Sequence, residues 1–208
     1  MFPKPVSALA PNTFAYEQLP LVKPTGFREY DARWLFGPEL NLMGVQALGM
    51  GLGALLLEMG VAPKIVVGHD YRAYSASIKL ALTAGLMASG AQVLDIGLAL
   101  SPMAYFAQFS LDVPCVAMVT ASHNDNGWTG VKMGAQRPLT FGPDEMTRLK
   151  DIVLGSAFKL PGGGSYHFVE NFPARYIGDL TNRPKIKRKL KVVAACGSGV
   201  RRGMGSFS

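Results

Sequence analysis

The stretch KIVVGHDYRAYSASIKLALTAGLMASGAQVLDIG, residues 64–97, determines the class of fold. Its first five residues, 64–68, are mostly apolar and β-branched, which is typical of a buried strand. A helical period follows, for which we expect Ser75 or Ser77 as the cap and Gly90 as the end. Residues 92–97 form a second short apolar run. A strand, a helix and a strand in this order predict a parallel βαβ unit.

The same alternation continues on both sides of this stretch. Near-continuous apolar strands between helices are typical of a parallel sheet covered on both faces. We therefore predict an α/β fold, a three-layer α/β/α domain with a mixed, mainly parallel sheet. The further elements are a helix opened by Gly37-Pro38 and ended by Gly60, a helix from Pro102, a strand over 113–119, a return strand over 129–133, and a helix from 142 to 153.

Composition changes suggest four segments. Residues 1–24, broken by prolines, are interpreted as a loose N-terminal arm rather than a signal peptide. Residues 25–160 form the α/β domain, which a glycine run closes. Residues 161–189 are predicted to be a connector that is helical over 166–180. Residues 190–208 begin a second α/β domain with a strand over 190–195, and lost periodicity from about residue 198 predicts a truncated or out-of-frame end.

The cysteines and the hydropathy of the chain indicate in which cellular compartment to expect the protein. Cys115 and Cys196 lie far apart and form no CxxC pair, which argues against a disulfide framework or a thiolate metal site. We expect a reducing, cytoplasmic location. Because no apolar run reaches the roughly 18 residues of a membrane span, we expect no membrane partner.

The net charge of +7 comes from one end of the chain. Residues 182–208 carry eight Lys and Arg and no acid, whereas residues 1–181 hold 13 basic and 14 acidic side chains. A basic surface favours nucleic-acid binding, but here the body of the protein is nearly neutral. We interpret 185–191 as a solvated connector and expect no nucleic-acid partner.

A polar loop follows the apolar strand that ends at Val119. It reads TASHNDNGWTGVKMG, residues 120–134, and places Ser122 at the strand end, where backbone N–H groups of a turn can hold an anion. Ser122 could be a nucleophile, a phosphate carrier or a turn former. Because adjacent residues point in different directions and no GxSxG surrounds Ser122, His123 does not imply a hydrolase-type dyad, although a hydrolase stays an alternative. A hairpin would return Lys132 to Ser122, which suits phosphate handling.

Three motifs in order resemble the α-D-phosphohexomutase family. TASHN, residues 120–124, with GVK at 130–132, resembles its phosphoserine loop. FREYDAR, residues 27–33, resembles its N-terminal segment, and GHDYR, residues 68–72, resembles a polar strand end. The resemblance covers about residues 25–155. It implies a phosphomannomutase/phosphoglucomutase, with phosphoglucosamine mutase as the alternative branch.

The resemblance implies roles for eight residues. Ser122 would carry a phosphoryl group between hexose 1- and 6-phosphates through a hexose 1,6-bisphosphate, in carbohydrate metabolism. His123 would act as acid and base or position the phosphoryl group, and Lys132 and Arg33 would offset the transferring charge. The remaining four would support the loop or the substrate: Tyr30, Asn124, Arg72 and Asp70. Hexose phosphates are the expected partners, and the oligomeric state stays open.

The chain departs from the family in two respects. Asp125 stands where the family loop often has proline, and Thr129 stands where asparagine is usual. The family's aspartate-rich Mg²⁺ loop is absent, so only the phosphate of Ser122 would reach a metal, and Mg²⁺ would be held weakly. We therefore expect little turnover from this chain alone, and a non-catalytic first-domain fragment is the rival interpretation.

GMGLGA, residues 49–54, matches a dinucleotide-binding pattern, with Asp70 about twenty residues further on. That pattern requires a strand before the glycines, whereas residues 40–48 have a helical period. We therefore expect these glycines to permit close packing of a helix.

Overall fold

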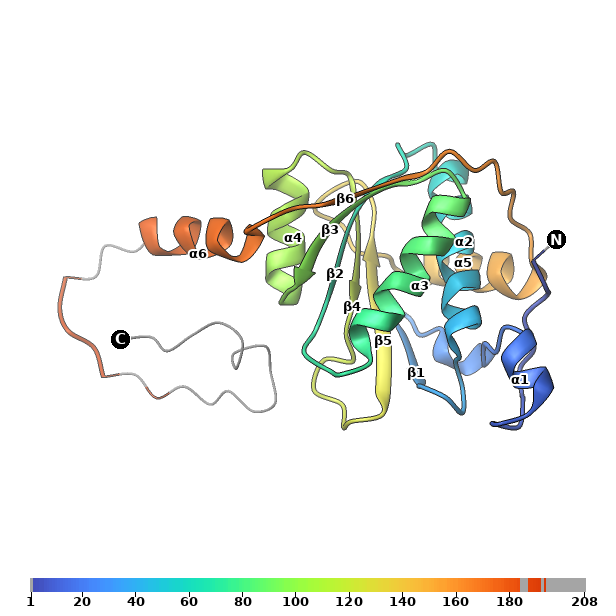
Figure 1. Ribbon diagram of the computed structural model, residues 1–208. Coiled ribbons are helices and arrows are strands. Elements are labelled where there is room, and N and C mark those ends of the chain that lie inside the picture. The colour runs from blue at the N-terminus through green and yellow to red at the C-terminus, as the bar shows by residue number, and fades with distance from the viewer. Residues whose placement is uncertain (1, 184–186, 192, 194–208) are drawn as a thin grey trace.

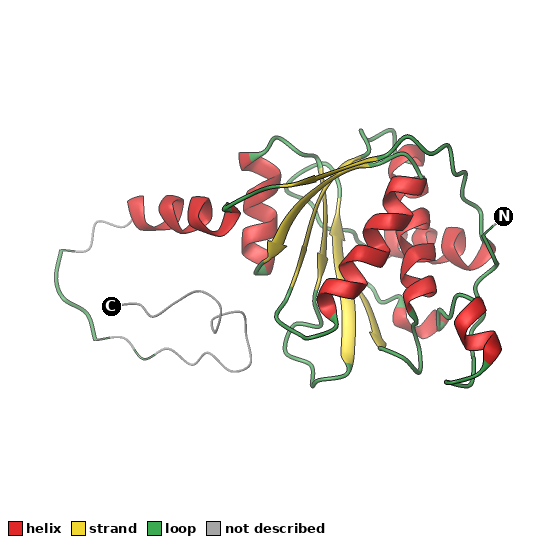
Figure 2. Ribbon diagram, viewed as in Figure 1, coloured by secondary structure: helices red, strands yellow, loops and turns green. Residues whose placement is uncertain are grey.

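The computed structural model describes residues 2–183, 187–191 and 193. Figures 1 and 2 show a sheet with helices on both sides. The helices are α1 Phe14–Gln18, α2 Leu42–Glu58, α3 Ser75–Ala88, α4 Ser101–Ser110, α5 Pro143–Gly155 and α6 Phe172–Asn182, with a 3-10 turn at Pro24–Gly26. The strands are β1 Ala32–Leu35, β2 Lys64–His69, β3 Gln92–Leu98, β4 Cys115–Val119, β5 Trp128–Gly134 and β6 Ser165–Phe168.

The six strands form one sheet in the order β1-β5-β4-β2-β3-β6. Strands β4, β2, β3 and β6 are parallel neighbours, and β5 is antiparallel to both β4 and β1. Only β5 therefore runs against the other strands of this sheet. The predicted α/β fold with a mixed, mainly parallel sheet is confirmed.

Two apolar layers lie on opposite faces of the sheet. Helices α2, α3 and α5 cover one face, and α4 and α6 lie on the other (Figure 1). The larger core joins Leu48 of α2, Leu82 of α3 and Leu149 of α5 to alternate residues of the strands. The smaller core joins Met103 of α4 and Phe172 of α6 to the other strand face. Because β2 and β4 are covered on both faces, their residues are almost continuously apolar, as the sequence predicted.

Helices α2 and α3 approach each other closely through glycine. A Cβ at Gly49 would lie 2.3 Å from the Leu82 carbonyl oxygen, and one at Gly85 would lie 2.1 Å from the Gln46 carbonyl oxygen. The GMGLGA stretch lies within α2 and serves this packing. A dinucleotide loop, which needs a strand before it, is excluded there.

Two helix starts differ from the prediction. Helix α2 begins at Leu42, where the Asn41 side chain accepts a hydrogen bond from the Gly44 N–H at 2.8 Å. Gly37-Pro38 lies before it in a turn, so Pro38 does not open the helix. Helix α3 begins at Ser75 without a side-chain cap, because the Ser75 hydroxyl donates to Asp70 instead.

The N-terminal segment is packed rather than loose. The Val6 N–H donates to the Pro20 carbonyl at 2.9 Å, and Leu21 and Val22 are completely buried. Asn41 fixes this segment further, because its side chain also accepts from the Leu21 N–H at 2.9 Å. The interpretation of 1–24 as a loose arm is therefore wrong for its second half.

The segment after the glycine run forms a strand before its helix. Residues 165–168 form β6, which extends the sheet by pairing with β3, and the helix α6 starts only at Phe172. The prediction of a helical connector from 166 is therefore wrong over β6. Half of the strand predicted over 190–195 falls outside the described residues, and so does the predicted change near residue 198.

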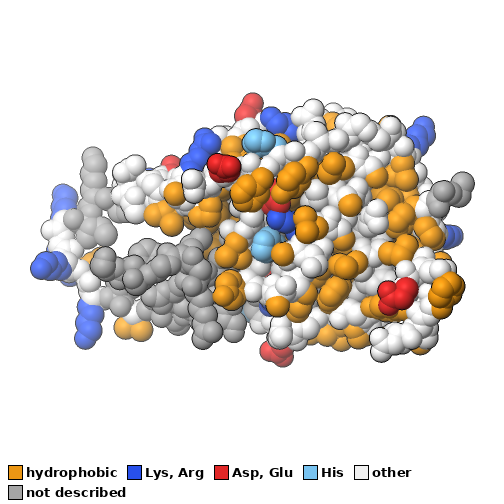
Figure 3. All heavy atoms as spheres, viewed as in Figure 1, with side chains coloured by type: hydrophobic (Ala, Val, Ile, Leu, Met, Phe, Trp, Pro, Cys, Tyr) orange, Lys and Arg blue, Asp and Glu red, His pale blue; other side chains and the backbone are white. Residues whose placement is uncertain are grey.

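The described part of the chain contains no helix with the length and hydrophobicity that crossing a bilayer requires. On the face shown in Figure 3, charged side chains are sparse among apolar and uncharged ones. Leu80 on α3 and Phe109 on α4 are among the exposed apolar side chains, each 58% exposed.

Candidate functional site

The polar segments that follow β2 and β4 lie side by side. The two strands are parallel neighbours, with His69 opposite Val119, and the Asp70 N–H donates to the Val119 carbonyl at 3.0 Å. One guanidinium nitrogen of Arg72 then donates to the Asn124 carbonyl at 2.6 Å. Both polar segments therefore lie at the carboxyl edge of the sheet, where ligands gather in α/β folds.

Ser122 lies exposed at the start of the loop in an uncommon backbone conformation. Its φ is +55°, in the left-handed region that side chains other than glycine rarely adopt. The Ser122 N–H donates to the Thr120 hydroxyl at 3.0 Å, which helps to hold this turn. Ser122 is exposed to solvent there, and uncommon backbone conformations are often found at functional sites.

The structure brings Ser122 and His123 together. The Ser122 Oγ and the His123 Nδ1 are 3.3 Å apart, within hydrogen-bonding distance. The argument that neighbouring residues must point apart is therefore wrong here, because the positive φ of Ser122 ends the alternation of an extended strand. A proton can pass between these two atoms.

Arg33 on β1 joins the segment 31–33 to the Ser122 loop and is only 8% exposed. Its Nη1 donates to the Ala121 carbonyl at 2.8 Å and to the Asn124 side chain. Its Nε and Nη2 donate to the Asp31 carboxylate at 3.1 and 2.7 Å. A positive charge is therefore fixed beside the loop by hydrogen bonds from all three guanidinium nitrogens.

Arg72 supports the loop from the β2 side. Its guanidinium pairs with the Asp70 carboxylate and donates to the Asn124 carbonyl. The second carboxylate oxygen of Asp70 accepts from the Ser75 hydroxyl at 2.6 Å. Asp70 is 7% exposed, so its charge acts on Arg72 with little solvent between them.

The far end of the loop is bound by Tyr74. The Gly127 N–H donates to the Tyr74 hydroxyl, which itself donates to the Trp128 carbonyl, each at 2.8 Å. The Phe36 N–H donates to the Gly127 carbonyl at 2.9 Å. The loop is thus fixed by arginines at its start and by a tyrosine at its end.

Lys132 and Tyr30 are placed by strand register and by exposure, and their roles beside Ser122 stay predictions. The hairpin forms, but its register places Lys132 opposite Met118, four residues before Ser122. Lys132 shares the sheet face of Arg33, which is opposite Gly130. Tyr30 is 61% exposed and is therefore not a core residue. A hydrogen bond to Glu29 and the charge of Glu29 raise the pKa of Tyr30. Within the described residues, neither side chain hydrogen-bonds to the loop.

Sequence reasoning missed four residues that hold the site, namely Asp31, Tyr74, Ser75 and Thr120. Asp31 and Arg33 are two residues apart on an extended segment, so period-two alternation could have placed both on one side. Thr120, Ser75 and Tyr74 act through turns whose geometry no spacing rule indicates. Their partners belong to other segments, and only the folded chain brings them together.

The described residues do not fit a Mg²⁺ ion by themselves. Mg²⁺ prefers several oxygen ligands, but Asp31 is bound by Arg33, and Asp70 by Arg72 and Ser75. The part of the chain that the structure describes contains no cluster of three or more His, Cys, Asp or Glu that could hold a metal. Metal ligands would have to come from elsewhere.

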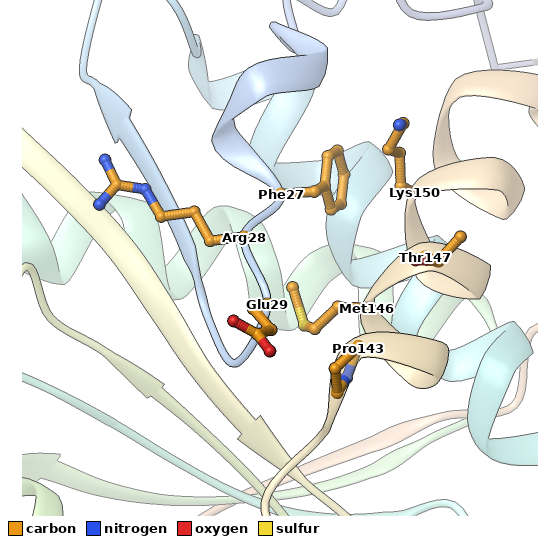
Figure 4. A pocket seen from close by; sticks show the side chains of 7 residues that line it. All are labelled: Phe27, Arg28, Glu29, Pro143, Met146, Thr147 and Lys150. Carbon is orange, nitrogen blue, oxygen red and sulfur yellow. The ribbon is translucent and has the colours of Figure 1, made fainter.

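A small hollow of about 200 Å³ lies apart from this loop, between the segment before β1 and helix α5 (Figure 4). Figure 4 shows Met146 and Phe27 turned toward it, while Arg28 points away. Its lining includes no residue of the Ser122 loop. We therefore assign the chemistry to the open edge of the sheet rather than to this hollow.

Comparisons with known proteins agree with this architecture. Residues 24–159 match the family model described as phosphoglucomutase/phosphomannomutase, alpha/beta/alpha domain I. The chain therefore belongs to the phosphoglucomutase/phosphomannomutase family, and the predicted resemblance is confirmed.

Individual relatives lead to the same family. The chain is 42% identical over 128 residues to a phosphomannomutase of Escherichia coli, which covers 62% of this chain and 27% of the relative. It is 30% identical over 156 residues to a Methanobrevibacter smithii protein named "Probable phosphoglucosamine mutase". That match covers 74% of this chain and 35% of the relative. This chain also superposes on the crystal structure of a phosphoglucomutase/phosphomannomutase family protein from Burkholderia thailandensis, with a TM-score of 0.73 and 26% sequence identity. The superposition covers 81% of this chain and 38% of the other. The chain thus spans about a third of these relatives' length.

Proposed function

We propose that the protein is a phosphohexomutase that interconverts the 1- and 6-phosphates of mannose or glucose, with Ser122 as the phosphoryl carrier. The observation that carries this proposal is the position of Ser122. It lies exposed at the carboxyl end of β4, 3.3 Å from His123 and beside a loop that two arginines hold. Carrier chemistry needs an accessible hydroxyl, a proton partner and nearby positive charge.

The proposed reaction has two balanced transfers. In the first, the bond between phosphorus and the Ser122 Oγ breaks, and phosphorus bonds to the free sugar hydroxyl, which loses its proton. The product is a hexose 1,6-bisphosphate. The Ser122 oxygen takes up a proton, and His123 Nδ1 is within reach to deliver it.

After the sugar turns over, the second transfer runs in the opposite sense. The Ser122 hydroxyl gives its proton to His123 and bonds to the other phosphorus, while the departing sugar oxygen takes up a proton. Arg33 and Arg72 offset the negative charge at the loop throughout, because their guanidinium groups are held there by Asp31 and Asp70. Lys132 supplies a further cation on the face of Arg33.

This chain performs only part of that cycle in our proposal. It spans 27% of the Escherichia coli relative, and its described carboxylates do not provide a Mg²⁺ site. We expect Ser122 to accept a phosphoryl group slowly from glucose 1,6-bisphosphate, but we expect little mutase turnover. Hexose phosphates are the proposed partners, and Mg²⁺ would be bound mainly by residues outside this part of the chain.

Intact-mass spectrometry after incubation with glucose 1,6-bisphosphate and Mg²⁺ tests the carrier role, alongside a coupled glucose 1-phosphate to glucose 6-phosphate assay. We expect one added phosphate on Ser122, none in Ser122→Ala, and an unchanged result in Ser77→Ala, an exposed serine on α3. Phosphate on another residue, or none, would contradict the carrier role. Robust turnover that Ser122→Ala abolishes would show instead that this chain suffices.

Phosphoglucosamine mutase is the second candidate, which the Methanobrevibacter smithii relative favours. Glucosamine 1,6-bisphosphate used as the donor distinguishes the two. Faster phosphorylation of Ser122 from glucosamine 1,6-bisphosphate than from the glucose or mannose compound would favour the glucosamine reaction.

A further inference from the structure

We propose that Tyr74 is a positioning residue that latches the end of the Ser122 loop and so sets the geometry of phosphoryl transfer. The catalytic part of this inference rests on the proposed function, whereas the latch itself is a property of the fold. Tyr74 precedes the first residue of α3, on the segment that follows β2. It therefore links the loop after β4 to the neighbouring strand connection.

The Tyr74 hydroxyl satisfies two backbone groups of adjacent residues at once. It accepts from the Gly127 N–H and donates to the Trp128 carbonyl, both at 2.8 Å. A hydroxyl can donate and accept at the same time, whereas phenylalanine of the same shape can do neither. Removing the oxygen leaves a partly buried N–H and a partly buried carbonyl without these partners, which is the costly way to lose a hydrogen bond.

The Tyr74 ring is itself held in place. It stacks on Phe36 with ring centroids 5.5 Å apart and an angle of 23° between the planes. The Phe36 backbone N–H donates to the carbonyl of Gly127 at 2.9 Å. One residue of the loop, Gly127, therefore has its N–H bound by Tyr74 and its carbonyl bound by the residue on which Tyr74 stacks.

The loop needs such an anchor because little else packs against its end. Gly127 has a φ of +97°, and a Cβ there would have no atom within 4 Å. Ser122, His123, Asp125 and Asn126 are exposed. The arginines bind only residues up to Asn124, and strand pairing begins at Trp128, which lies opposite Leu35. The segment 125–127 between them is therefore fixed to the rest of the protein mainly through Tyr74 and Phe36. A free end would loosen Asn124, which both arginines bind, and through it the turn that carries Ser122 and His123.

Two measurements on the full chain test the latch, with Tyr74→Phe as the variant. The first is hydrogen exchange of the Gly127 amide, which we expect to become at least about tenfold faster because its partner is lost. The second is the rate of Ser122 phosphorylation against the concentration of glucose 1,6-bisphosphate. We expect the maximal rate to fall roughly tenfold, with a half-saturating concentration that changes less than about twofold, because misplacement affects transfer more than binding.

The matched control is Tyr176→Phe, whose ring packs on Phe106 on the other side of the sheet. It should change neither measurement. Phe36→Leu keeps the Tyr74 hydroxyl but removes its stacking partner, and we expect an intermediate increase in Gly127 exchange.

The outcomes separate this inference from the proposed function. Unchanged Gly127 exchange in Tyr74→Phe would overturn the latch, whatever Ser122 does. Faster exchange with an unaltered maximal rate would overturn the positioning role. If Ser122 of the unmodified chain takes no phosphate, the proposed function and with it the positioning role fail, while the exchange measurement still decides the latch.

Discussion

At the scale of single residues, the guanidinium of Arg33 determines how the site is held. It binds a carboxylate on one side and two groups of the Ser122 loop on the other, and it is only 8% exposed. Lysine cannot reproduce this pattern, because an ammonium group lacks the planar fork and reaches fewer acceptors at once.

We therefore predict that Arg33→Lys lowers the free energy of unfolding by about 2 kcal/mol and slows phosphorylation of Ser122 by roughly a hundredfold. Urea unfolding and intact-mass kinetics measure the two effects. Arg28→Lys is the control, because Arg28 is exposed and only lies over the Trp128 ring, 5.7 Å from its centroid. Equal effects of both substitutions would contradict the assigned importance of Arg33.

The hydrogen bonds of Glu39 make the stability of the protein depend on pH. Its carboxylate accepts from Lys23 Nζ at 2.6 Å and from the Leu35 N–H at 3.0 Å. The hydrogen bond from Lys23 lowers the pKa of Glu39 below its ordinary 4.5, more than burial raises it. Because the folded-state pKa is depressed, this contribution is present above about pH 4.5 and is lost as the pH falls through the lower, folded-state pKa.

We expect wild-type protein to be more stable than Glu39→Gln at pH 7, with the difference shrinking as the pH falls below 4.5. The effect should be modest, since the Lys23 side chain is 44% exposed. Chemical unfolding at several pH values measures it. A difference that grows toward low pH would contradict the assigned sign.

At the scale of elements, buried ones could be predicted and exposed ones could not. Strands β2 and β4 are apolar on both faces, so their positions followed from the sequence. Strand β6, Ser165–Phe168, was missed because all four of its residues are exposed at an edge, where no burial pattern marks a strand. The start of α2 was misplaced because Pro38 lies in a turn that Asn41 ends.

The contact of α2 and α3 yields a prediction of its own. Gly85→Ala would place a Cβ 2.1 Å from the Gln46 backbone oxygen, so the helices would have to separate. We expect a loss of about 3 kcal/mol in the free energy of unfolding. Gly178→Ala on α6 is the control, since a Cβ there has open space and should be neutral or stabilising by up to about 1 kcal/mol. Thermal or urea unfolding compares the two variants.

At the scale of the whole molecule, the candidate site joins residues that are remote in sequence. The sequence indicated that the strands ending at residues 68 and 119 both lead into polar segments, and the sheet order now shows that these segments are neighbours. It could not indicate the register of the hairpin that places Lys132 opposite Met118, nor the hydrogen bonds of Tyr74 to the loop. Register and turn geometry depend on packing across the sheet, which no local pattern encodes.

The edge position of β1 has a consequence for how the protein is made. Strand β1 pairs in this sheet only with β5. Ala32 therefore cannot pair until Val131 has been synthesised. A ribosome adds roughly 5–20 residues each second, so β1 spends several seconds of synthesis without a partner. During that time Trp34, which is completely buried in the finished fold, lacks its strand partner Thr129. The hydrogen bonds from Arg33 to Ala121 and Asn124 can form only after the Ser122 loop has emerged, so the site is completed well after β1 has been made.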